Sequence, residues 1–317
     1  MAPKISVCIP TYNYAHYISF VVESILSQQF TDFELLIVDD CSRDNTEEVV
    51  SRFLYDKRVL FEKNERNLGL VANWNKCLSK ARGEYIKFVF ADDMLASDKA
   101  LSRMAGILDS APSVSLVASA RYLIDSQSRI IGLTSHFARD FMADGPEVIN
   151  RCLNEFRNLI GEPTAVMFRK TDCARGFDER YRHLVDMEMW LHLLEKGLFA
   201  FIAEPLVSFR VHQGQKTKEN VARLAHLDDQ YLMLKDYLGK SYLHISFIMK
   251  FYLTFDVYYN SVRLWRKGVI TREEATRIIL AHCSYLQFYC YYPIYKLMRL
   301  FFKIRRRIGR KTGGNKI

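Results

Sequence analysis

The chain has 317 residues, of which 49% are hydrophobic and 26% charged, so it can bury the core of one large or two modest globular domains. Its net charge of +9 belongs to the C-terminal end: residues 1–240 hold 30 Lys and Arg against 33 Asp and Glu, whereas residues 241–317 hold 15 against 3. Seven cysteines without CxxC spacing argue against a zinc site or a disulfide framework and favour a reducing compartment.

The N-terminus starts with a strand-like run over residues 5–9 and lacks the layout of a signal peptide. The longest uncharged stretch, residues 278–295, contains His282, Ser284 and Gln287 as well as several tyrosines. Such polarity suits an interface better than the centre of a bilayer. We therefore expect a cytoplasmic protein without a transmembrane span.

Short apolar runs alternate with helical patterns through the first ~125 residues, which is typical of a parallel sheet flanked by helices. The fold class predicted for this half is therefore α/β. In chain order the patterns predict a strand over residues 5–9, a helix over 17–28, a strand over 34–38, a helix over 46–53, a strand over 59–62, a helix over 71–81, a strand over 85–90, a helix over 98–108 and a strand over 115–120.

The middle of the chain is less regular. Its patterns predict a helix over residues 145–156, a strand over 164–168 and a helix over 186–195 that Gly197 ends. From residue 224 onward the pattern is helical and rich in aromatic residues. We expect two parts, a catalytic domain over residues 1–220 and a helical, basic region over 221–317.

Two pairs of adjacent carboxylates, Asp39-Asp40 and Asp92-Asp93, each follow an apolar, strand-like run. Neighbouring carboxylates repel each other beside a buried core, and a divalent cation carrying phosphate oxygens would stabilise them. Because ligands of open parallel sheets bind beyond the carboxyl ends of the strands, both pairs are expected in one crevice.

The sequence contains neither GxGxxG nor GxxxxGK[ST], so it lacks the loops that cradle phosphate in dinucleotide-binding and P-loop proteins. A nucleotide diphosphate held without such a loop needs a metal ion, which the acidic pair Asp92-Asp93 can supply with ligands. The crevice would also contain the stretch Pro10-Thr11-Tyr12-Asn13.

An ordered series of motifs runs over roughly residues 4–215. The motifs are Pro10-Thr11-Tyr12-Asn13, the stretch from Ile37 to Thr46, Asn67-Leu68-Gly69, Gly83-Glu84-Tyr85, Ala91-Asp92-Asp93, Gly176-Phe177-Asp178-Glu179, the stretch from Asp186 to Leu191, and Phe209-Arg210-Val211-His212. Each motif alone is modestly specific, but their order and spacing together are highly specific. The series resembles the family 2 glycosyltransferases, and the resemblance implies the GT-A fold, a Rossmann-like, mainly parallel sheet flanked by helices, here followed by a C-terminal helical region.

The resemblance also implies roles on the donor side of the reaction. Asp40 would accept a hydrogen bond from the nucleotide base, in a pocket lined by Pro10 and Tyr12. Asp92 would lie near the ribose and the metal, and Asp93 would bind Mn²⁺ or Mg²⁺ directly.

For three further residues, alternatives stay open. Asp186 matches the general base that deprotonates the acceptor hydroxyl with inversion at the anomeric carbon, but it could also be only the N-cap of the helix that follows. His212 would bind the metal or the diphosphate, or be an ordinary structural histidine. Asn67 would contact the nucleotide or only shape its loop. Trp190 is expected in the core rather than as a platform for a sugar.

Two residues depart from the pattern of the family. Phe90 stands where the family often has a further Asp, so Asp92 and Asp93 must hold the metal nearly alone. Val185 stands where an acid often precedes the base, and the absence of that like charge leaves the pKa of Asp186 less raised than in the usual pair.

The C-terminal residues predict a basic amphipathic helix, which would lie on an anionic membrane surface with its tyrosines at the level of the headgroups. The alternative is a helical region that packs its apolar stripe on the catalytic half. Nucleic acid is not an expected partner, because no recognition module accompanies the charges. The apolar stripe is Ile294, Leu297, Met298, Phe301, Ile304 and Ile308, and the tyrosines are Tyr285, Tyr289, Tyr291, Tyr292 and Tyr295.

The predicted activity is metal-dependent, inverting transfer of a sugar from a nucleotide-diphosphate donor, favoured to be a uridine diphosphate sugar, to a glycan hydroxyl. The acceptor would be lipid-linked, at the inner face of the cell membrane, as in bacterial surface polysaccharide synthesis. The sequence lacks the Gln-x-x-Arg-Trp motif of processive synthases, which favours single additions. Two alternatives are transfer onto polyprenyl phosphate, and a non-catalytic nucleotide-sugar-binding partner in a membrane complex.

Overall fold

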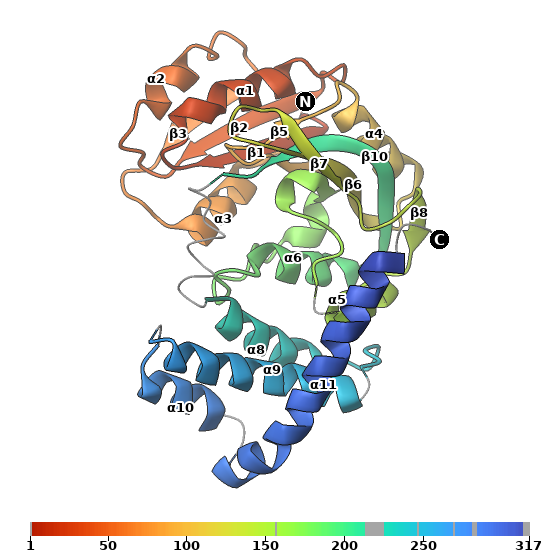
Figure 1. The fold of residues 1–317 in the computed structure, drawn as a ribbon. Coiled ribbons are helices and arrows are strands. Elements are labelled where there is room, and N and C mark those ends of the chain that lie inside the picture. The colour runs from red at the N-terminus through yellow and green to blue at the C-terminus, as the bar shows by residue number, and fades with distance from the viewer. Residues whose placement is uncertain are drawn as a thin grey trace. The chain divides into compact units, whose positions relative to one another are not determined.

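The computed structural model describes residues 2–155, 157–212, 225–245, 247–268, 270–280 and 284–312 (Figure 1). The chain divides into two compact units, the first formed by residues 1–152 and 157–223 and the second by residues 153–156 and 224–317. The predicted boundary at residues 220 and 221 lies outside the described residues and stays a prediction.

A single mixed sheet organises the first unit. Its strands are β1 (Ile5–Thr11), β2 (Phe33–Asp39), β3 (Val59–Lys63), β4 (Tyr85–Phe88), β5 (Met94–Leu95), β6 (Val114–Ile124), β7 (Ile130–Thr134), β8 (Phe141–Ala143), β9 (Val166–Arg169) and β10 (Leu198–Arg210). They are arranged in the order β3-β2-β1-β4-β9-β6-β10-β5, with β7 pairing with β6 and β8 with β10. The β3-β2-β1-β4 half is parallel, and β9 is antiparallel to both of its neighbours. The parallel half therefore brings the carboxyl ends of β1, β2 and β4 to one edge.

Helices cover both faces of this sheet (Figure 1). On one face lie α1 (Ala15–Leu26), α2 (Thr46–Ser51) and α4 (Ala100–Ser110), and on the other lie α3 (Leu70–Lys80) and α6 (Val185–Leu194). Strands β1, β2 and β4 are buried nearly throughout, as expected for a sheet covered on both sides, whereas the edge strand β3 is only partly buried. This architecture confirms the predicted α/β class.

Side chains that alternate along the strands fill the two layers between sheet and helices. Val7 and Ile37 belong to the core on the α1 side, together with Val21 of α1 and Met104 of α4. On the other side, the ring of Trp74 in α3 lies 6.2 Å from that of Phe88, and that of Trp190 in α6 lies 5.6 Å from that of Phe168. Trp190 is fully buried, which confirms the prediction that it is a core residue.

The predicted elements of this unit are present, with ends that differ by a few residues. The predicted strand over residues 164–168 begins as a 3₁₀ turn, η1 (Pro163–Ala165), before continuing as β9. The long strand β10 was not predicted, because its pairing with β6 shifts register around Pro205 and so breaks the period of two on which the prediction depends. A second 3₁₀ turn, η2 (Lys170–Cys173), also belongs to this unit, and helix α5 (Gly145–Glu155) starts in it and ends with three residues of the second unit.

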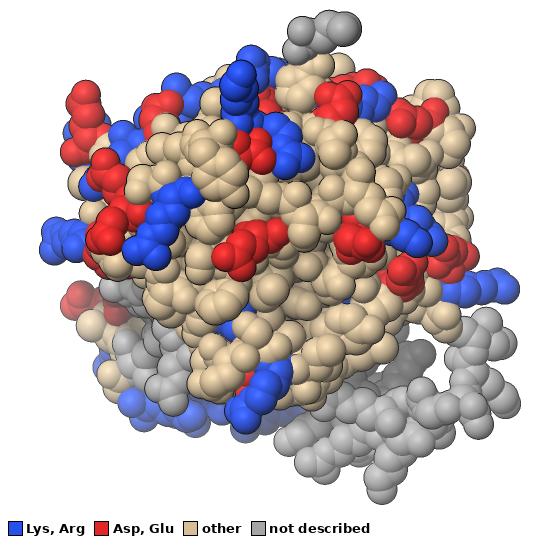
Figure 2. All heavy atoms as spheres, turned by 90° about the horizontal axis from the view of Figure 1, so that it is seen from above, with Lys and Arg blue, Asp and Glu red and all other residues tan. Residues whose placement is uncertain are grey.

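The surface of the first unit carries mixed charge on the face shown in Figure 2, where acidic and basic side chains are interspersed. This agrees with the nearly even balance of Lys and Arg against Asp and Glu over residues 1–240. The strongly basic character of the chain therefore has to be explained by its C-terminal part.

The second unit is helical, as predicted from residue 224 onward, with α8 (Ala225–Tyr237), α9 (Phe247–Arg266), α10 (Arg272–Leu280) and α11 (Tyr285–Thr312). Its core contains Tyr295 of α11, and the partly buried Tyr292 packs against that core. The expectation that Tyr295 lies at lipid headgroups is therefore wrong, because its side chain is fully buried. No helix in the described part of the chain has the length and apolarity that crossing a bilayer requires.

Candidate functional site

A cavity of about 430 Å³ lies beyond the carboxyl ends of the parallel strands in the first unit. Segments far apart in the sequence form its walls, among them the end of β1, the turns after β2 and β4, and the start of α6. The predicted site residues that line it are Pro10, Tyr12, Asp40, Asn67, Asp92 and Asp186. Among the described residues, Asp93 and His212 are predicted site residues that do not belong to this lining.

Asp40 holds the loop that follows β3. Its Oδ1 accepts hydrogen bonds from Asn64 Nδ2 at 2.8 Å and from the backbone N of Leu68 at 2.7 Å, and its Oδ2 accepts one from the backbone N of Gly69 at 2.9 Å. Gly69 has a φ of +89°, a conformation that glycine adopts without strain. Asn67 closes the same loop by donating from Nδ2 to the Asp40 carbonyl oxygen at 3.1 Å.

A carboxylate offers about four acceptor positions, and these hydrogen bonds use three of those on Asp40. Oδ2 therefore retains the capacity to accept one more N–H at the cavity wall. This is compatible with the base-binding role implied for Asp40. The neighbouring Asp39 is fully buried and instead accepts hydrogen bonds from Ser42, so it is a structural turn residue.

Asp92 and His212 form a pair at the edge of the cavity. The Nε2 atom of His212 lies 2.9 Å from Oδ2 of Asp92, and the exposed fractions of the two side chains are only 11% and 13%. The rings of Tyr14 and Tyr17 lie 6.1 and 5.5 Å from the imidazole. Because β10 ends at Arg210, the sheet brings a histidine 120 positions away to the turn after β4.

Asp93 has a different environment from Asp92. It is 1% exposed, and its carboxylate accepts hydrogen bonds from Thr164 Oγ1 at 2.5 Å and from the backbone N of Arg210 at 2.9 Å. Burial and the adjacent Asp92 raise the pKa of Asp93 well above its usual range. These contacts fasten the turn after β4 to η1 and to β10.

Arg210 clamps the same turn through its side chain. Its Nε donates to the Asp92 carbonyl oxygen at 2.7 Å, and its Nη1 donates to the Asp125 carbonyl oxygen at 2.8 Å and to Ser128 Oγ at 2.9 Å. The guanidinium is fully buried and lies 4.4 Å from the centre of the Tyr17 ring. A lysine could not make this forked set of hydrogen bonds.

Substitution Arg210→Lys is therefore expected to lower the free energy of unfolding by ~2–3 kcal/mol, since buried hydrogen bonds from a charged donor are lost. It should also weaken donor binding, because the backbone of Asp92 loses its support. Chemical denaturation and donor titration measure the two effects. Arg129→Lys, an exposed partner of Asp125, is the control. Unchanged donor affinity in the buried variant would contradict the positioning role of Arg210.

Asp186 lies in the first turn of α6 and faces the cavity. Leu184 occupies the N-cap position, so the interpretation of Asp186 as the N-cap is wrong. Burial, opposed by hydrogen bonds from backbone amides and reinforced by the nearby Glu162, raises the pKa of Asp186 to about 7. Asn158 Nδ2 donates to its Oδ2 at 3.3 Å. A carboxylate with this pKa is suited to accept a proton at neutral pH.

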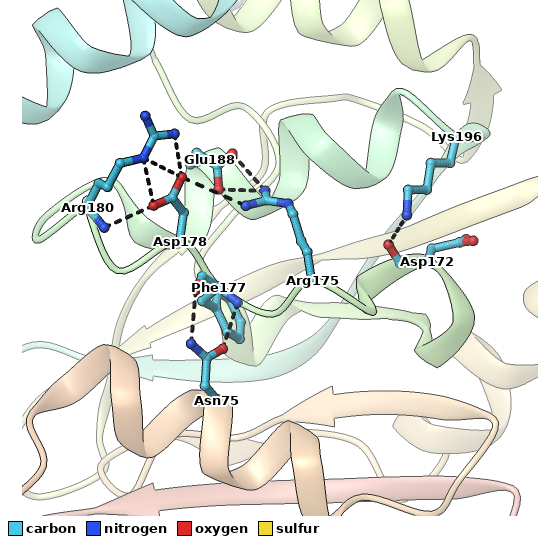
Figure 3. Close-up of polar contacts among 8 residues, drawn as sticks. All are labelled: Asn75, Asp172, Arg175, Phe177, Asp178, Arg180, Glu188 and Lys196. Carbon is cyan, nitrogen blue, oxygen red and sulfur yellow. Dashed lines mark hydrogen bonds and ion pairs between the residues drawn. The ribbon is translucent and has the colours of Figure 1, made fainter.

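The loop that precedes α6 is fixed by polar contacts on both sides (Figure 3). Both carboxylate oxygens of Glu188 lie 2.7 Å from Arg175 Nη2, which ties the loop to α6. Asn75 of α3 donates to the carbonyl oxygen of Phe177 at 2.9 Å and accepts from its backbone N at 2.7 Å. Asp178 pairs with Arg180 at 2.6 Å. Asp186 thus follows a segment that is anchored to both α3 and α6.

Several cavity residues were not predicted as site residues. Glu162 and Arg182 add charged groups and His183 adds an imidazole to the lining that contains Asp186, and Trp74 and Phe90 form an aromatic wall with ring centres 4.9 Å apart. The sequence around Trp74 did not indicate a site residue, since a tryptophan at this position of α3 is as typical of a core residue as of a cavity residue. Arg182 and His183 lie four and three positions before Asp186, and that proximity was the available signal.

Comparison with known proteins identifies the family. "Glycosyl transferase family 2" matches residues 6–177, more than half of the chain. The E. coli UDP-Glc:alpha-D-GlcNAc-diphosphoundecaprenol beta-1,3-glucosyltransferase WfgD is 26% identical over 247 residues, which cover 78% of this chain and 91% of WfgD.

Two solved structures share the fold. That of S. aureus TarS 1–349 in complex with UDP-GlcNAc has a TM-score of 0.61 at 19% identity and covers 86% of this chain and 77% of that one. That of the mannosyltransferase PcManGT from Pyrobaculum calidifontis, in complex with GDP-Man and Mn²⁺, has a TM-score of 0.55 at 18% identity and covers 96% and 85%. The two structures show the shared fold, and the family match shows that this chain belongs to the family 2 glycosyltransferases.

Proposed function

We propose that the chain transfers a sugar from a nucleotide-diphosphate donor, with uridine diphosphate favoured, to a hydroxyl of a glycan acceptor, with inversion at the anomeric carbon. The observation that carries this proposal is the placement of Asp186, with a pKa of about 7, in the same cavity as Asp92. Asp186 takes the proton of the attacking hydroxyl, and the Asp92 side of the cavity receives the diphosphate that leaves.

Asp92 and His212 fit a divalent cation better than Asp92 and Asp93 do. The carboxylate of Asp92 faces the cavity beside an imidazole nitrogen, whereas that of Asp93 is buried and accepts two hydrogen bonds. We therefore propose Asp92 and His212 as the ligands of Mn²⁺ or Mg²⁺ and assign Asp93 to holding the turn. A cation there would neutralise the negative charge that develops on the leaving diphosphate.

The ligand set from the protein is small. The described residues contain no group of three or more His, Cys, Asp or Glu side chains that could hold a metal ion. Two protein ligands leave room for diphosphate oxygens and water, which is the usual arrangement for Mg²⁺ at phosphates. PcManGT, which shares the fold, is known in complex with Mn²⁺.

The acceptor would approach from the α6 side of the cavity. Arg182 and His183 line the cavity together with Asp186, so a guanidinium and an imidazole share its lining with the proposed base. Such groups suit an acceptor that carries phosphate near the reacting hydroxyl. We propose a lipid-linked glycan at the inner face of the cell membrane as acceptor, in keeping with the diphosphoundecaprenol-linked acceptor named for WfgD.

Transfer directly onto polyprenyl phosphate is a second candidate, which the same cationic groups favour. The two differ in the atom that attacks. A phosphate monoester already carries ionised oxygens at neutral pH, so its attack needs no general base. An Asp186→Asn variant that retains full activity would therefore favour polyprenyl phosphate over a glycan hydroxyl. The non-catalytic alternative is disfavoured by the retention of Asp40, Asp92 and Asp186 around one cavity.

The test is to incubate the chain with UDP-, GDP- and dTDP-sugars, with and without Mn²⁺, and to measure nucleotide release and acceptor labelling. We expect turnover with one donor class and its loss in EDTA, restored by excess Mn²⁺. Polyprenyl-diphosphate-linked N-acetylglucosamine and polyprenyl phosphate serve as parallel acceptors. No metal-dependent turnover with any donor would refute the proposal.

A further inference from the structure

The helix α11 has two faces of opposite character in its described side chains. Toward the second unit it turns Phe288, Tyr292 and Tyr295, which pack against α9. The hydroxyl of Tyr295 donates to Asp256, and the guanidinium of Arg299 lies 3.9 Å from the centre of the Tyr259 ring. This face of α11 therefore packs against the core of the second unit.

The other face of α11 carries large apolar side chains exposed to solvent. We call this set the α11 ridge. Its members are separated by three or five positions and lie within one side of a helix of 3.6 residues per turn. They are Leu286, Tyr289, Ile294, Leu297 and Leu300, with exposed fractions of 75%, 70%, 50%, 71% and 57%.

The ridge differs from the stripe expected from the sequence. It starts at Leu286, two turns before Ile294, and it excludes Met298, which is half-buried. Phe301, Ile304 and Ile308 lie outside the residues whose side chains the structure describes. A truncation at residue 294 would therefore leave part of the ridge in place, and point substitutions are the sharper probe.

The basic residues of the segment that contains the ridge indicate which kind of surface the ridge binds. Residues 275–317 contain ten Lys and Arg and no Asp or Glu. Two copies of such a segment would repel each other, which disfavours self-association through the ridge. An anionic lipid surface is complementary to both the basic and the apolar residues of this segment. Its headgroups attract the cations, and its acyl boundary accepts the apolar side chains.

We infer that the α11 ridge is a binding surface for an anionic lipid bilayer, on which α11 lies parallel to the membrane plane. The α11 ridge would be the surface through which the protein attaches at the proposed membrane location. This assignment rests on α11 alone and does not depend on which sugar the cavity transfers.

The first experiment is flotation of the full chain with vesicles of phosphatidylcholine alone or mixed with phosphatidylglycerol. We expect binding to the mixed vesicles that falls as salt is raised from ~0.05 to ~0.5 M, since screening weakens it. The combined substitution Leu286→Gln, Leu297→Gln and Leu300→Gln should lower vesicle affinity at least ~10-fold, as expected for loss of apolar anchors.

A matched control removes the same kind of side chain from the first unit. Ile130, Ile131 and Leu133 of β7 are exposed by 63%, 57% and 59%, and all three are changed to Gln. This control should bind vesicles within ~2-fold of the original chain, because the ridge alone is the anchor. Nucleotide release with a soluble acceptor should be unchanged in both triple variants, which separates membrane binding from catalysis. Equal binding by the ridge variant and the original chain would overturn the inference.

A second measurement needs no disruptive substitution. Cys290 is exposed between Tyr289 and Ile294, whereas Cys8, Cys77, Cys152 and Cys173 are buried. With Cys41→Ser and Cys283→Ser, an environment-sensitive dye on Cys290 should shift its emission to the blue on anionic vesicles and be quenched by lipid-borne quenchers. The same dye on the exposed Lys235→Cys of α8, with Cys290→Ser, should not respond. A Cys290 dye that stays in water on bound vesicles, or dimers held by the ridge in sedimentation without vesicle binding, would refute the lipid assignment.

Discussion

Replacement of Asp186 with Asn is expected to slow sugar transfer by ~10²–10⁴-fold, the usual contribution of a general base. Donor affinity should be retained, because the Asp92–His212 side of the cavity is untouched. Single-turnover transfer and donor titration measure the two quantities separately. Glu179→Gln changes an exposed carboxylate in the loop before α6 and should be without effect. A slow Glu179→Gln variant, or an Asp186→Asn variant that remains fully active on a glycan hydroxyl, would contradict the assignment of the base.

The pH dependence of the reaction should follow the same carboxyl group. A base acts in its ionised form, and the pKa of Asp186 is raised to about 7, so transfer should rise with pH through 7 and level off above it. The Asp186→Asn variant should lack this rise, which a rate measured from about pH 5.5 to about pH 9 would show.

Stability should respond to pH in the opposite direction. Between 3.8 and about 7 the folded chain keeps a proton on Asp186 that the unfolded chain has released. The free energy of unfolding should therefore fall as pH rises through this window, and the Asp186→Asn variant should lose that part of the slope.

Substitution by Asn should affect donor affinity differently at Asp92 and at Asp93. Asp92→Asn is expected to reduce Mn²⁺-dependent donor affinity by ~10²–10³-fold, because a metal ligand worth several kcal/mol is removed. Asp93→Asn should cost less than ~10-fold in the same assay. An asparagine retains an acceptor for the backbone N of Arg210 and can donate to Thr164 Oγ1, so the buried contacts are kept.

Titration of Mn²⁺ and of the donor at fixed enzyme concentration decides between these outcomes. His212→Gln should resemble Asp92→Asn, since both change the pair proposed as the metal ligands. The reverse order, with Asp93→Asn abolishing metal dependence and Asp92→Asn remaining active, would restore Asp93 as the direct ligand.

The parts of this fold that follow from local pattern were predictable from the sequence. The parallel strands and their helices have regular apolar periods, and the acidic pairs at their ends placed the crevice at the correct edge. The strand β10 was missed because Glu204 and Pro205 interrupt its apolar run where it bulges. That strand brings Arg210 and His212 to the site, so the clamp on the turn after β4 was missed with it.

The division of labour between Asp92 and Asp93 could not be read from the sequence. Asp92 and Asp93 have identical side chains and share the same sequence neighbourhood. Only the path of the backbone through the turn decides which of the two is buried. Here Thr164, 71 positions later, reaches Asp93 rather than Asp92. The raised pKa of Asp186 was likewise hidden, because it arises mainly from burial and not from an adjacent acid such as the one that Val185 replaces.

The loop around Asp40 has a consequence for how such an enzyme could change its donor. The carboxylate of Asp40, which we propose accepts a hydrogen bond from the nucleotide base, also holds the backbone of Leu68 and Gly69. Its substitution would remove the support of this loop as well as alter recognition of the base. Pro10 and Tyr12 line the same cavity without holding that loop. Divergence toward other nucleobases should therefore proceed at these two positions, with Asp40 kept fixed.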